Sequence, residues 1–161
     1  MKSVALIAAL ALVALPAFAQ NAAEVGHAQD GASCPRCNLF QADLSNKDLP
    51  GRNFTGARLR QADLSVSVFD HGRFAGVDLR DVNGYGGRFT DADFAGADMT
   101  NATFVGAYLE GANLRGARLS GVNFSGAEMA RAVGLSQAQL NAACGDAATK
   151  LPPGLRIPAC R

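Results

Sequence analysis

The residues best suited to chemistry are four cysteines, Cys34, Cys37, Cys144 and Cys160, which lie as two pairs near the two ends of the chain. The first pair forms the motif Cys-Pro-Arg-Cys, the spacing of thiol oxidoreductases, in which the start of a helix lowers a cysteine pKa. An even number of cysteines in an oxidising compartment indicates disulfides, and four cysteines allow three pairings. The first pair could therefore be a structural disulfide, a redox centre or, with His27, part of a metal site.

No other set of residues has the spacing of a catalytic site. The chain has no nucleophile with a base at motif spacing, no phosphate-binding loop and no carboxylate pair that the sequence places in a cleft. A zinc site would need four ligands, and only Cys34, Cys37 and His27 lie near one another. We expect His71 to be solvated rather than catalytic. The sequence therefore predicts no enzymatic activity, no cofactor and no metal.

The first 19 residues have the features of a secretory signal peptide. Lys2 precedes an apolar run from Val4 to Leu15, and Ala17-Phe18-Ala19 forms a cleavage site before Gln20. A spanning helix needs about 20 apolar residues, so this run is too short to cross a membrane. No cysteine follows the cut, so a lipid anchor is not indicated. We expect cleavage after Ala19 and a periplasmic or secreted protein with no membrane anchor.

The charge of the mature chain is balanced. Removal of Lys2 leaves 14 bases against 14 acids, which takes the formal charge from +1 to 0. A neutral balance argues against a nucleic-acid footprint or a polybasic membrane patch. By its length the mature chain is one domain.

A period of five residues dominates the chain from residue 38 to residue 131. Counting by fives from Leu39 to Met129, eighteen of nineteen positions are Leu, Phe or Met, and Gly84 is the exception. The residue two positions before each of these large residues is small, and Lys47 and Arg52 are the exceptions. Neither a helix nor a flat strand places residues five apart on one face. The pattern becomes coherent if the chain turns a corner in every repeat, so that both positions face a common axis.

Four corners close a coil of 20 residues, so the repeats predict an all-β solenoid of about five stacked coils. Glycine ends ten repeats and is expected at the corners, where a positive φ is least costly for this residue. Phrases such as Ala42-Asp43-Leu44-Ser45 and Ala112-Asn113-Leu114-Arg115 match the pattern A(D/N)LxX and resemble the pentapeptide-repeat family. The resemblance implies a right-handed quadrilateral β-helix. It implies no single activity.

The two open ends of such a stack need caps. Ser136 as N-cap with Gln139 at N3 predicts a short C-terminal helix, which Gly145 is expected to stop after Cys144. The residues after it, with Pro152-Pro153, predict an extended lid. The expected division of the chain is a signal peptide at 1–19, an N-terminal segment with CxxC at 20–37, the repeats at 38–131 and a C-terminal cap at 132–161.

The repeats separate the two cysteine pairs. We therefore expect one disulfide between Cys34 and Cys37 at the entrance of the stack and another between Cys144 and Cys160 within the C-terminal cap. The motif leads directly into a repeat, with Cys37 at the small inward position, which favours the structural disulfide over the redox centre and the metal site.

Gly84 stands where a large inward residue is expected. One interpretation is a bulge or a hole that the ring of a neighbour fills, because Phe104 and Leu64 should lie directly above and below. The other is a locally loosened coil that marks a contact surface at the exposed Tyr85. Tyr108 is a second outward aromatic residue, so Tyr85 and Tyr108 are the candidate contact residues.

Two classes of function remain. The first is an exported, non-catalytic scaffold or protein-interaction module whose partner is an unidentified envelope protein. The second is a thiol-disulfide redox protein that uses Cys34 and Cys37. The resemblance suggests a third, since some members of the family protect DNA gyrase with acidic rods that resemble a duplex. The repeats hold 11 acids and 10 bases, and the expected export separates the protein from DNA, so we expect no nucleic-acid partner.

Overall fold

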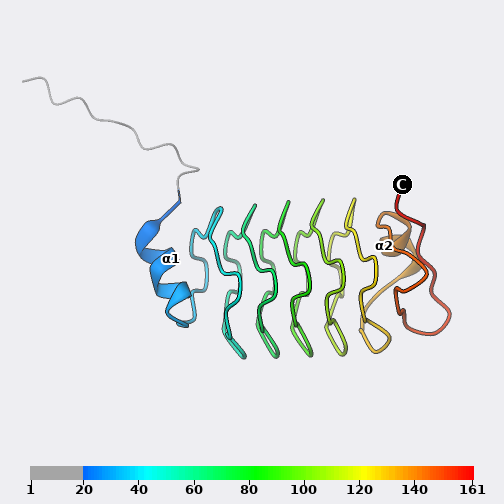
Figure 1. The fold of residues 1–161 in the computed structure, drawn as a ribbon, viewed down its shortest axis with the longest axis horizontal. Helices are drawn as coiled ribbons and strands as arrows, with labels where there is room; N and C mark the ends of the chain where they lie inside the picture. The colour runs from blue at the N-terminus through cyan, green and yellow to red at the C-terminus, as the bar shows by residue number, and fades with distance from the viewer. Residues whose placement is uncertain (1–19) are drawn as a thin grey trace, which may run out of the picture.

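The structure is a computed structural model that describes residues 20–161. These residues form a stack of similar coils between a helix at one end and a less regular cap at the other (Figure 1). The predicted signal peptide, residues 1–19, lies outside the described residues.

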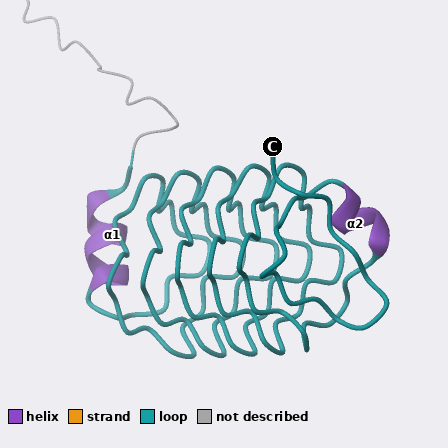
Figure 2. Ribbon diagram, turned by 45° about the vertical axis from the view of Figure 1, so that its right-hand side comes forward, coloured by secondary structure: helices purple, strands orange, loops and turns teal. Residues whose placement is uncertain are grey.

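Consecutive coils pair through parallel bridges between residues 20 positions apart, from Asn38 with Arg58 to Asn113 with Val133. The bridged residues form four columns, which define sides 1 to 4 of the stack. Side 1 contains Asn38, Arg58, Asp78, Asp98 and Arg118; side 2 Asp43, Asp63, Asn83, Thr103 and Asn123; side 3 Asp48, Val68, Arg88, Tyr108 and Glu128; side 4 Asn53, Arg73, Asp93, Asn113 and Val133. Each side contributes a single bridged residue per coil, so the described chain is drawn without strands (Figure 2).

The large residues of the repeats fill the axis of the stack, as the period predicts. None of these side chains is more than 3% exposed. Phenylalanine rings stack along the axis: the centroids of Phe54 and Phe74 are 5.4 Å apart, those of Phe74 and Phe94 5.1 Å, and those of Phe69 and Phe89 5.5 Å. Burial of each such side chain contributes about 1.5 to 3 kcal/mol before chain entropy is subtracted. This column of side chains is the core of the protein.

Each repeat turns its corner in a four-residue turn that begins at the large residue. In most repeats the N–H of the following small residue donates to the carbonyl of the large one, as from Ala42 to Leu39 at 3.1 Å. In the turns that begin at Leu39 to Phe124, the third residue has a positive φ, as in a type II turn. Ten of these residues are glycines, such as Gly106 at φ 64, but Val66 also adopts φ 54. A β-branched residue is strained in this region, so the corner at Val66 is unfavourable.

Where a repeat carries Asp or Asn before its large residue, this side chain shapes the corner. Its side-chain oxygen accepts a hydrogen bond from the backbone N–H two residues later, as Asp63 does from Ser65 at 2.9 Å and Asn113 from Arg115 at 3.1 Å. The same side chains also bond between coils, since Asn83 Nδ2 donates to Asp63 Oδ1 at 3.1 Å. The most regular polar position of the repeat therefore serves the fold and forms no site.

A helix that the sequence analysis did not predict covers the N-terminal end of the stack. This helix, α1 (Ala22–Gln29), buries Val25 and Ala28 against the first coil. The Glu24 carboxylate accepts a hydrogen bond from the backbone N–H of Asn38 at 2.5 Å. The helix thus closes an end where backbone groups would otherwise lack partners.

The short C-terminal helix, α2 (Gln137–Asn141), begins as predicted. Ser136 Oγ accepts a hydrogen bond from the N–H of Gln139 at 3.3 Å, and Gln139 Oε1 accepts one from the N–H of Ser136 at 2.9 Å. Gln139 also donates to the carbonyls of Leu114 and Ala117, both at 2.9 Å. One side chain therefore completes the capping box and fastens the helix to the last coil.

The predicted end of this helix is wrong. The helix ends at Asn141, and Cys144 lies beyond it in a parallel bridge with Asn123 of side 2. Lys150 continues side 3 in the same way by pairing with Glu128. The helix stops early because these backbone groups pair with the last coil, so the ladder extends beyond residue 131.

Candidate contact surface

The CxxC motif forms a corner of the stack. Cys34 and Cys37 are joined by a disulfide with a Cα–Cα distance of 5.4 Å. The N–H of Cys37 donates to the carbonyl of Cys34 at 3.4 Å, and Arg36 has φ 59, which is the turn geometry of the repeats. Cys34 is 1% exposed, and no helix begins at this residue. The motif therefore lacks the helix N-terminus that makes such cysteines reactive, and its first cysteine is buried while Cys37 is partly buried.

Neither histidine belongs to a site. His27 is exposed on α1, and Cys34 and Cys37 are joined to each other rather than free as thiolate ligands. Within residues 20–161, no three His, Cys, Asp or Glu side chains gather as metal ligands. His71 is exposed at a corner, with Nδ1 3.9 Å from Asp91 Oδ2.

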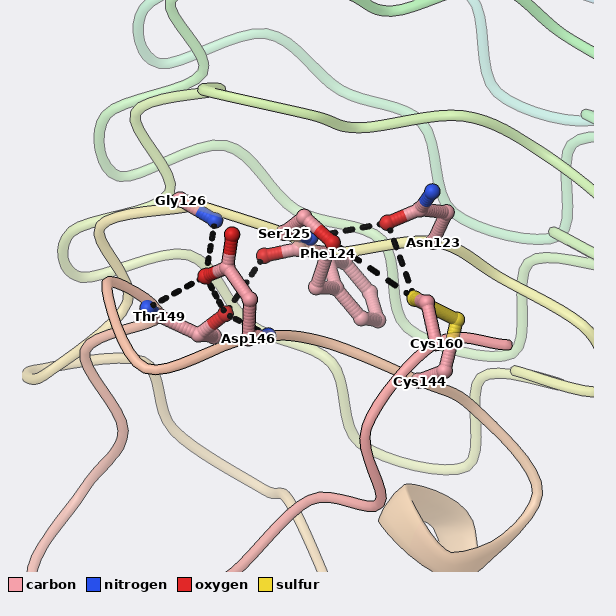
Figure 3. Close-up of a disulfide and its surroundings, with 8 residues drawn as sticks. All are labelled: Asn123, Phe124, Ser125, Gly126, Cys144, Asp146, Thr149 and Cys160. Carbon is pink, nitrogen blue, oxygen red and sulfur yellow. Dashed lines mark hydrogen bonds between the residues drawn. A yellow bond between two sulfur atoms is a disulfide. The ribbon is translucent and has the colours of Figure 1, made fainter.

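The second disulfide, between Cys144 and Cys160, fastens the tail to the last coil (Figure 3). Beside it, Asp146 Oδ1 accepts hydrogen bonds from the N–H of Gly126 at 2.9 Å and from the N–H of Thr149 at 3.1 Å. These bonds, that of Gly126 first, lower the pKa of the Asp146 carboxyl. The cluster anchors the C-terminal cap and contains no free nucleophile.

The hole at Gly84 is filled by a neighbour's ring. A Cβ built on Gly84 would lie 2.8 Å from Cε1 of Phe104, which occupies the vacant position from the next coil. The coil is not loosened, because Asn83 pairs through β-bridges with both Asp63 and Thr103. The N–H of Gly84 also donates to the Thr103 carbonyl oxygen at 2.7 Å. The exposure of Tyr85 therefore arises from its place at a corner. The interpretation of a loosened coil is wrong.

Exposed apolar side chains gather at the corner between sides 2 and 3. Val66 is 59% exposed, Tyr85 55% and Tyr108 46%. The N–H of Val66 donates to the carbonyl of Tyr85 at 2.9 Å, so these residues of neighbouring coils lie side by side. Tyr108 is on side 3 of the next coil, bridged to Arg88. We name this surface the tyrosine edge: the corner residues 45–46, 65–66, 85–86, 105–106 and 125–126, together with Tyr108.

The tyrosine edge differs from the other three corners in charge. Its ten corner positions hold no charged residue, whereas each other corner holds at least one. Arg80 and Asp81 occupy the corner between sides 1 and 2, Glu110 that between sides 3 and 4, and Arg115 that between sides 4 and 1. Val66 is an exposed apolar residue of this edge that the sequence analysis did not name as a candidate contact residue, although its place at the fifth position of a repeat indicates a corner.

The charged side chains that flank the tyrosine edge have hydrogen-bond partners. On side 2, Asp43 and Asp63 accept hydrogen bonds from the N–H groups of Ser45 and Ser65, at 3.0 and 2.9 Å. Arg88 lies on side 3 between Val68 and Tyr108, and its Nε donates to Asp70 Oδ2 at 2.8 Å. Burial raises the pKa of Asp70, but hydrogen bonds from the Arg88 side chain and the Thr90 backbone outweigh it and leave the pKa below its ordinary value. Elsewhere Arg80 pairs with Asp78 and Arg131 with Glu110.

The arrangement is suited to binding. Tyrosine and valine side chains project from a rigid, hydrogen-bonded backbone, and tyrosine supplies a large apolar ring with a polar hydroxyl. Such residues are enriched where proteins contact each other. Among residues 20–161, every buried side-chain N or O atom has a hydrogen-bond partner. None of the helices described is long and apolar enough to cross a membrane.

A family model described as pentapeptide repeats matches the chain in eight copies, over residues 32–69, 53–83, 88–126 and 104–144. The chain belongs to the pentapeptide-repeat family. Membership implies the right-handed quadrilateral β-helix, and proteins of this family are generally non-enzymatic scaffolds. A comparison with curated proteins found no match.

Several solved structures are similar to the chain. HetL of Nostoc sp. strain PCC 7120, a pentapeptide-repeat protein involved in the regulation of heterocyst differentiation, is 34% identical, with a TM-score of 0.61 over 64% of this chain and 49% of HetL. The present chain thus spans about half the length of HetL. A pentapeptide-repeat protein of the Arabidopsis thaliana thylakoid lumen is 28% identical, with a TM-score of 0.34 over 58% and 57% of the two chains. QnrB1, a plasmid-mediated fluoroquinolone resistance protein, is 19% identical, with a TM-score of 0.37 over 78% and 79%.

Proposed function

We propose that this protein is an exported, non-catalytic pentapeptide-repeat scaffold of about five coils that binds a protein of the cell envelope through the tyrosine edge. The observation that carries the proposal is an uncharged corner with exposed Val66, Tyr85 and Tyr108, on a stack whose other corners carry charged residues. Tyrosine adds contact area at a small loss of conformational entropy. Grouped apolar side chains on a surface otherwise rich in charge are typical of a protein-binding site.

The predicted export is supported by the cysteines. Both disulfides join residues that are close in the fold, and disulfides persist in oxidising compartments such as the periplasm. The signal peptide predicted at residues 1–19 would deliver the chain there. A periplasmic or secreted location is therefore part of the proposal.

The redox alternative finds less support. The reactive cysteine of a thiol oxidoreductase has its pKa lowered at a helix N-terminus or beside a cation, whereas Cys34 is 1% exposed, Cys37 is partly buried and both belong to a turn. Thiol counting on the native protein separates the two functions: the scaffold predicts no free thiol and no pair that equilibrates at thioredoxin-like potentials. A pair that is readily reduced at such potentials would favour the redox function.

Mimicry of a DNA duplex is also not supported. The repeats are close to neutral, and several of their acids, including Asp70, Asp78 and Glu110, are paired with arginines. An acidic stripe that could replace a duplex on a topoisomerase is therefore lacking in the described residues.

The proposal is tested with a photo-crosslinking amino acid placed at residue 85 of the exported protein in its native cells. The matched control carries the same amino acid in place of Ala95, which has the same position in a repeat of the same coil but lies between sides 4 and 1. We expect an adduct with an envelope protein from position 85 and not from position 95. Equal adducts at both positions, or none at 85, would contradict the proposal.

A binding measurement with the crosslinked protein completes the test. Tyr85→Ala and Tyr108→Ala should each weaken the affinity about tenfold or more, the effect of losing a central interface tyrosine. Ala95→Ser should leave the affinity unchanged. If neither tyrosine variant weakens binding, the contact lies elsewhere.

A further inference from the structure

The corner residues of the tyrosine edge change in size along the stack. At the position with positive φ, the successive coils carry Asn46, Val66, Gly86, Gly106 and Gly126. At this position side chains project from the N-terminal half of the edge, whereas glycines leave the C-terminal half lower. The residue before it carries a side chain in every coil: Ser45, Ser65, Tyr85, Val105 and Ser125. A Cβ on Gly86 or Gly106 would meet nothing within 4 Å, so this half is open to an approaching surface.

We infer that the tyrosine edge binds the same edge of a second copy of this chain, with the two stacks antiparallel. The inference rests on the proposed function, because it takes the edge as the contact surface and names its partner. A two-fold axis perpendicular to the stack, at the level of Gly86, reverses the order of the coils of the second copy. Each contact on one side of the axis is then repeated on the other side. Val66 of each copy then faces Gly106 of the other, because both lie one coil from Gly86. The raised half of each edge fits the low half of its partner.

The neighbouring side chains are compatible with this axis. Tyr85 directly precedes Gly86, so its ring lies beside the ring of its symmetry mate. On side 3, Val68 and Tyr108 lie one coil on either side of Arg88, and each therefore faces the other residue of the second copy. Arg88 approaches its own mate, but its charge is held by Asp70. The axis thus pairs Val68 with Tyr108, while at the ends of side 3 Asp48 faces Glu128, whose carboxylate lies 3.3 Å from Lys150 Nζ.

The lack of charge at this corner favours self-association. In a two-fold contact each surface meets itself, and burying charges without new partners is unfavourable. The other three corners carry charged residues, whereas the corner positions of the tyrosine edge carry none. A parallel arrangement would instead place Val66 against Val66 and glycine against glycine, which leaves a gap. The antiparallel arrangement avoids both the contact of Val66 with Val66 and the gap between facing glycines.

The size of the edge sets the strength of the contact. Five levels at a spacing of about 4.8 Å make an edge roughly 20 Å long, so each copy buries a few hundred Å², less than the ~800 Å² per partner of a standard stable interface. Association should therefore be weak and reversible, with a dissociation constant of about 10⁻⁵ to 10⁻⁴ M.

The experiment is sedimentation velocity on the exported, disulfide-bonded protein at concentrations from about 5 to 500 µM, which bracket that constant. Gly106→Asn fills the low half of the edge, and asparagine tolerates a positive φ. The matched control is Gly116→Asn, which lies in the same coil at the corner between sides 4 and 1, has φ 67 and also has nothing within 4 Å of its Cβ. We expect the wild type and the control to dimerise, and Gly106→Asn to bind at least tenfold more weakly.

A compensating pair of changes tests the register. Val66→Gly removes the raised side chain and should weaken the dimer, whereas Val66→Gly with Gly106→Val moves it to the other half and should restore association. Melting followed by circular dichroism checks that every variant is folded. A wild type that stays monomeric, equal association of the Gly106 and Gly116 variants, or a double variant that does not recover would overturn the inference.

The two proposals fail separately. If the purified protein is monomeric while position 85 crosslinks to a different envelope protein, the second copy is excluded and the interaction module stands. If position 85 crosslinks only to another copy of this chain, the inference is supported and the separate envelope partner is excluded.

Discussion

The contact between Gly84 and Phe104 offers a quantitative test of how the axis is packed. Phe104 is fully buried, and its ring centroid lies 5.4 Å from that of Phe89, 6.2 Å from that of Phe94 and 6.1 Å from that of Phe124. Gly84→Ala would place a Cβ 2.8 Å from this ring, which has no free space to retreat. The φ of Gly84 is not in the left-handed region, so alanine adds no backbone strain. Overpacking of this kind costs about 1 to 3 kcal/mol of folding free energy.

Gly84→Ala should stabilise the fold rather than destabilise it once the Phe104 ring is removed. Phe104→Ala alone should cost about 3 to 5 kcal/mol, because it deletes a buried ring and leaves a cavity that Gly84 cannot fill. In that background the nearest remaining contact of the new Cβ of Gly84→Ala is the Thr103 carbonyl oxygen, at 3.2 Å. Alanine then lowers the entropy of the unfolded chain and stabilises by up to about 1 kcal/mol. We therefore expect a coupling free energy of about 1 to 4 kcal/mol between the two substitutions.

The measurement is equilibrium unfolding in guanidinium chloride with both disulfides intact, followed by far-ultraviolet circular dichroism. Phe54→Ala serves as the control, because its ring lies farther along the axis and packs against Phe69 and Phe74. Its effect should add to that of Gly84→Ala within about 0.5 kcal/mol. If Gly84→Ala costs the same with and without the Phe104 ring, the explanation of the hole is refuted.

Three further predictions concern the register, the corners and the carboxylates. Phe104→Asp should abolish folding because it buries a carboxylate among apolar rings, whereas Thr103→Asp, one residue away on side 2, should keep the native circular dichroism spectrum. Equal behaviour of the two would show that the inward register is wrong. Val66→Asn should raise the free energy of unfolding by about 1 kcal/mol, because it removes a β-branched residue at φ 54. A melting temperature that is unchanged at low protein concentration would show that the backbone at Val66 is not strained. The pKa values of Asp70 and Glu110 are lowered in the folded protein, where hydrogen bonds from arginine and backbone N–H groups outweigh burial. A lowered folded pKa contributes stability above the unfolded value of about 4 and loses it as the pH falls through the folded value, so the melting temperature should be flat from about pH 8 to 5 and fall below about 4. A melting temperature that rises on acidification would contradict this sign.

The sequence predicts the features that repeat or that depend on near neighbours. The inward place of Phe104 and the capping box of Ser136 and Gln139 are examples, since each follows from a spacing of a few residues. The early end of α2 could not be predicted, because it depends on Cys144 pairing with a residue 21 positions earlier. Helix α1 was missed because the repeat period says nothing about the segment before it. The cue for α1 is local: Asn21 caps the helix by accepting a hydrogen bond from Glu24 at 3.3 Å.

By itself the sequence determined the five-residue period, the inward positions and the family, because a local pattern repeated many times leaves one way to bury its large residues. Only the tertiary structure decided which side chains of neighbouring coils contact each other. It showed that Phe104 fills the space at Gly84, and that Val66 and Tyr85, 19 residues apart, lie side by side at an uncharged corner. The physical reason is that contacts between coils depend on the register of the hydrogen-bonded stack. The shape of the tyrosine edge, with side chains on one half and glycines on the other, is therefore a property of the fold.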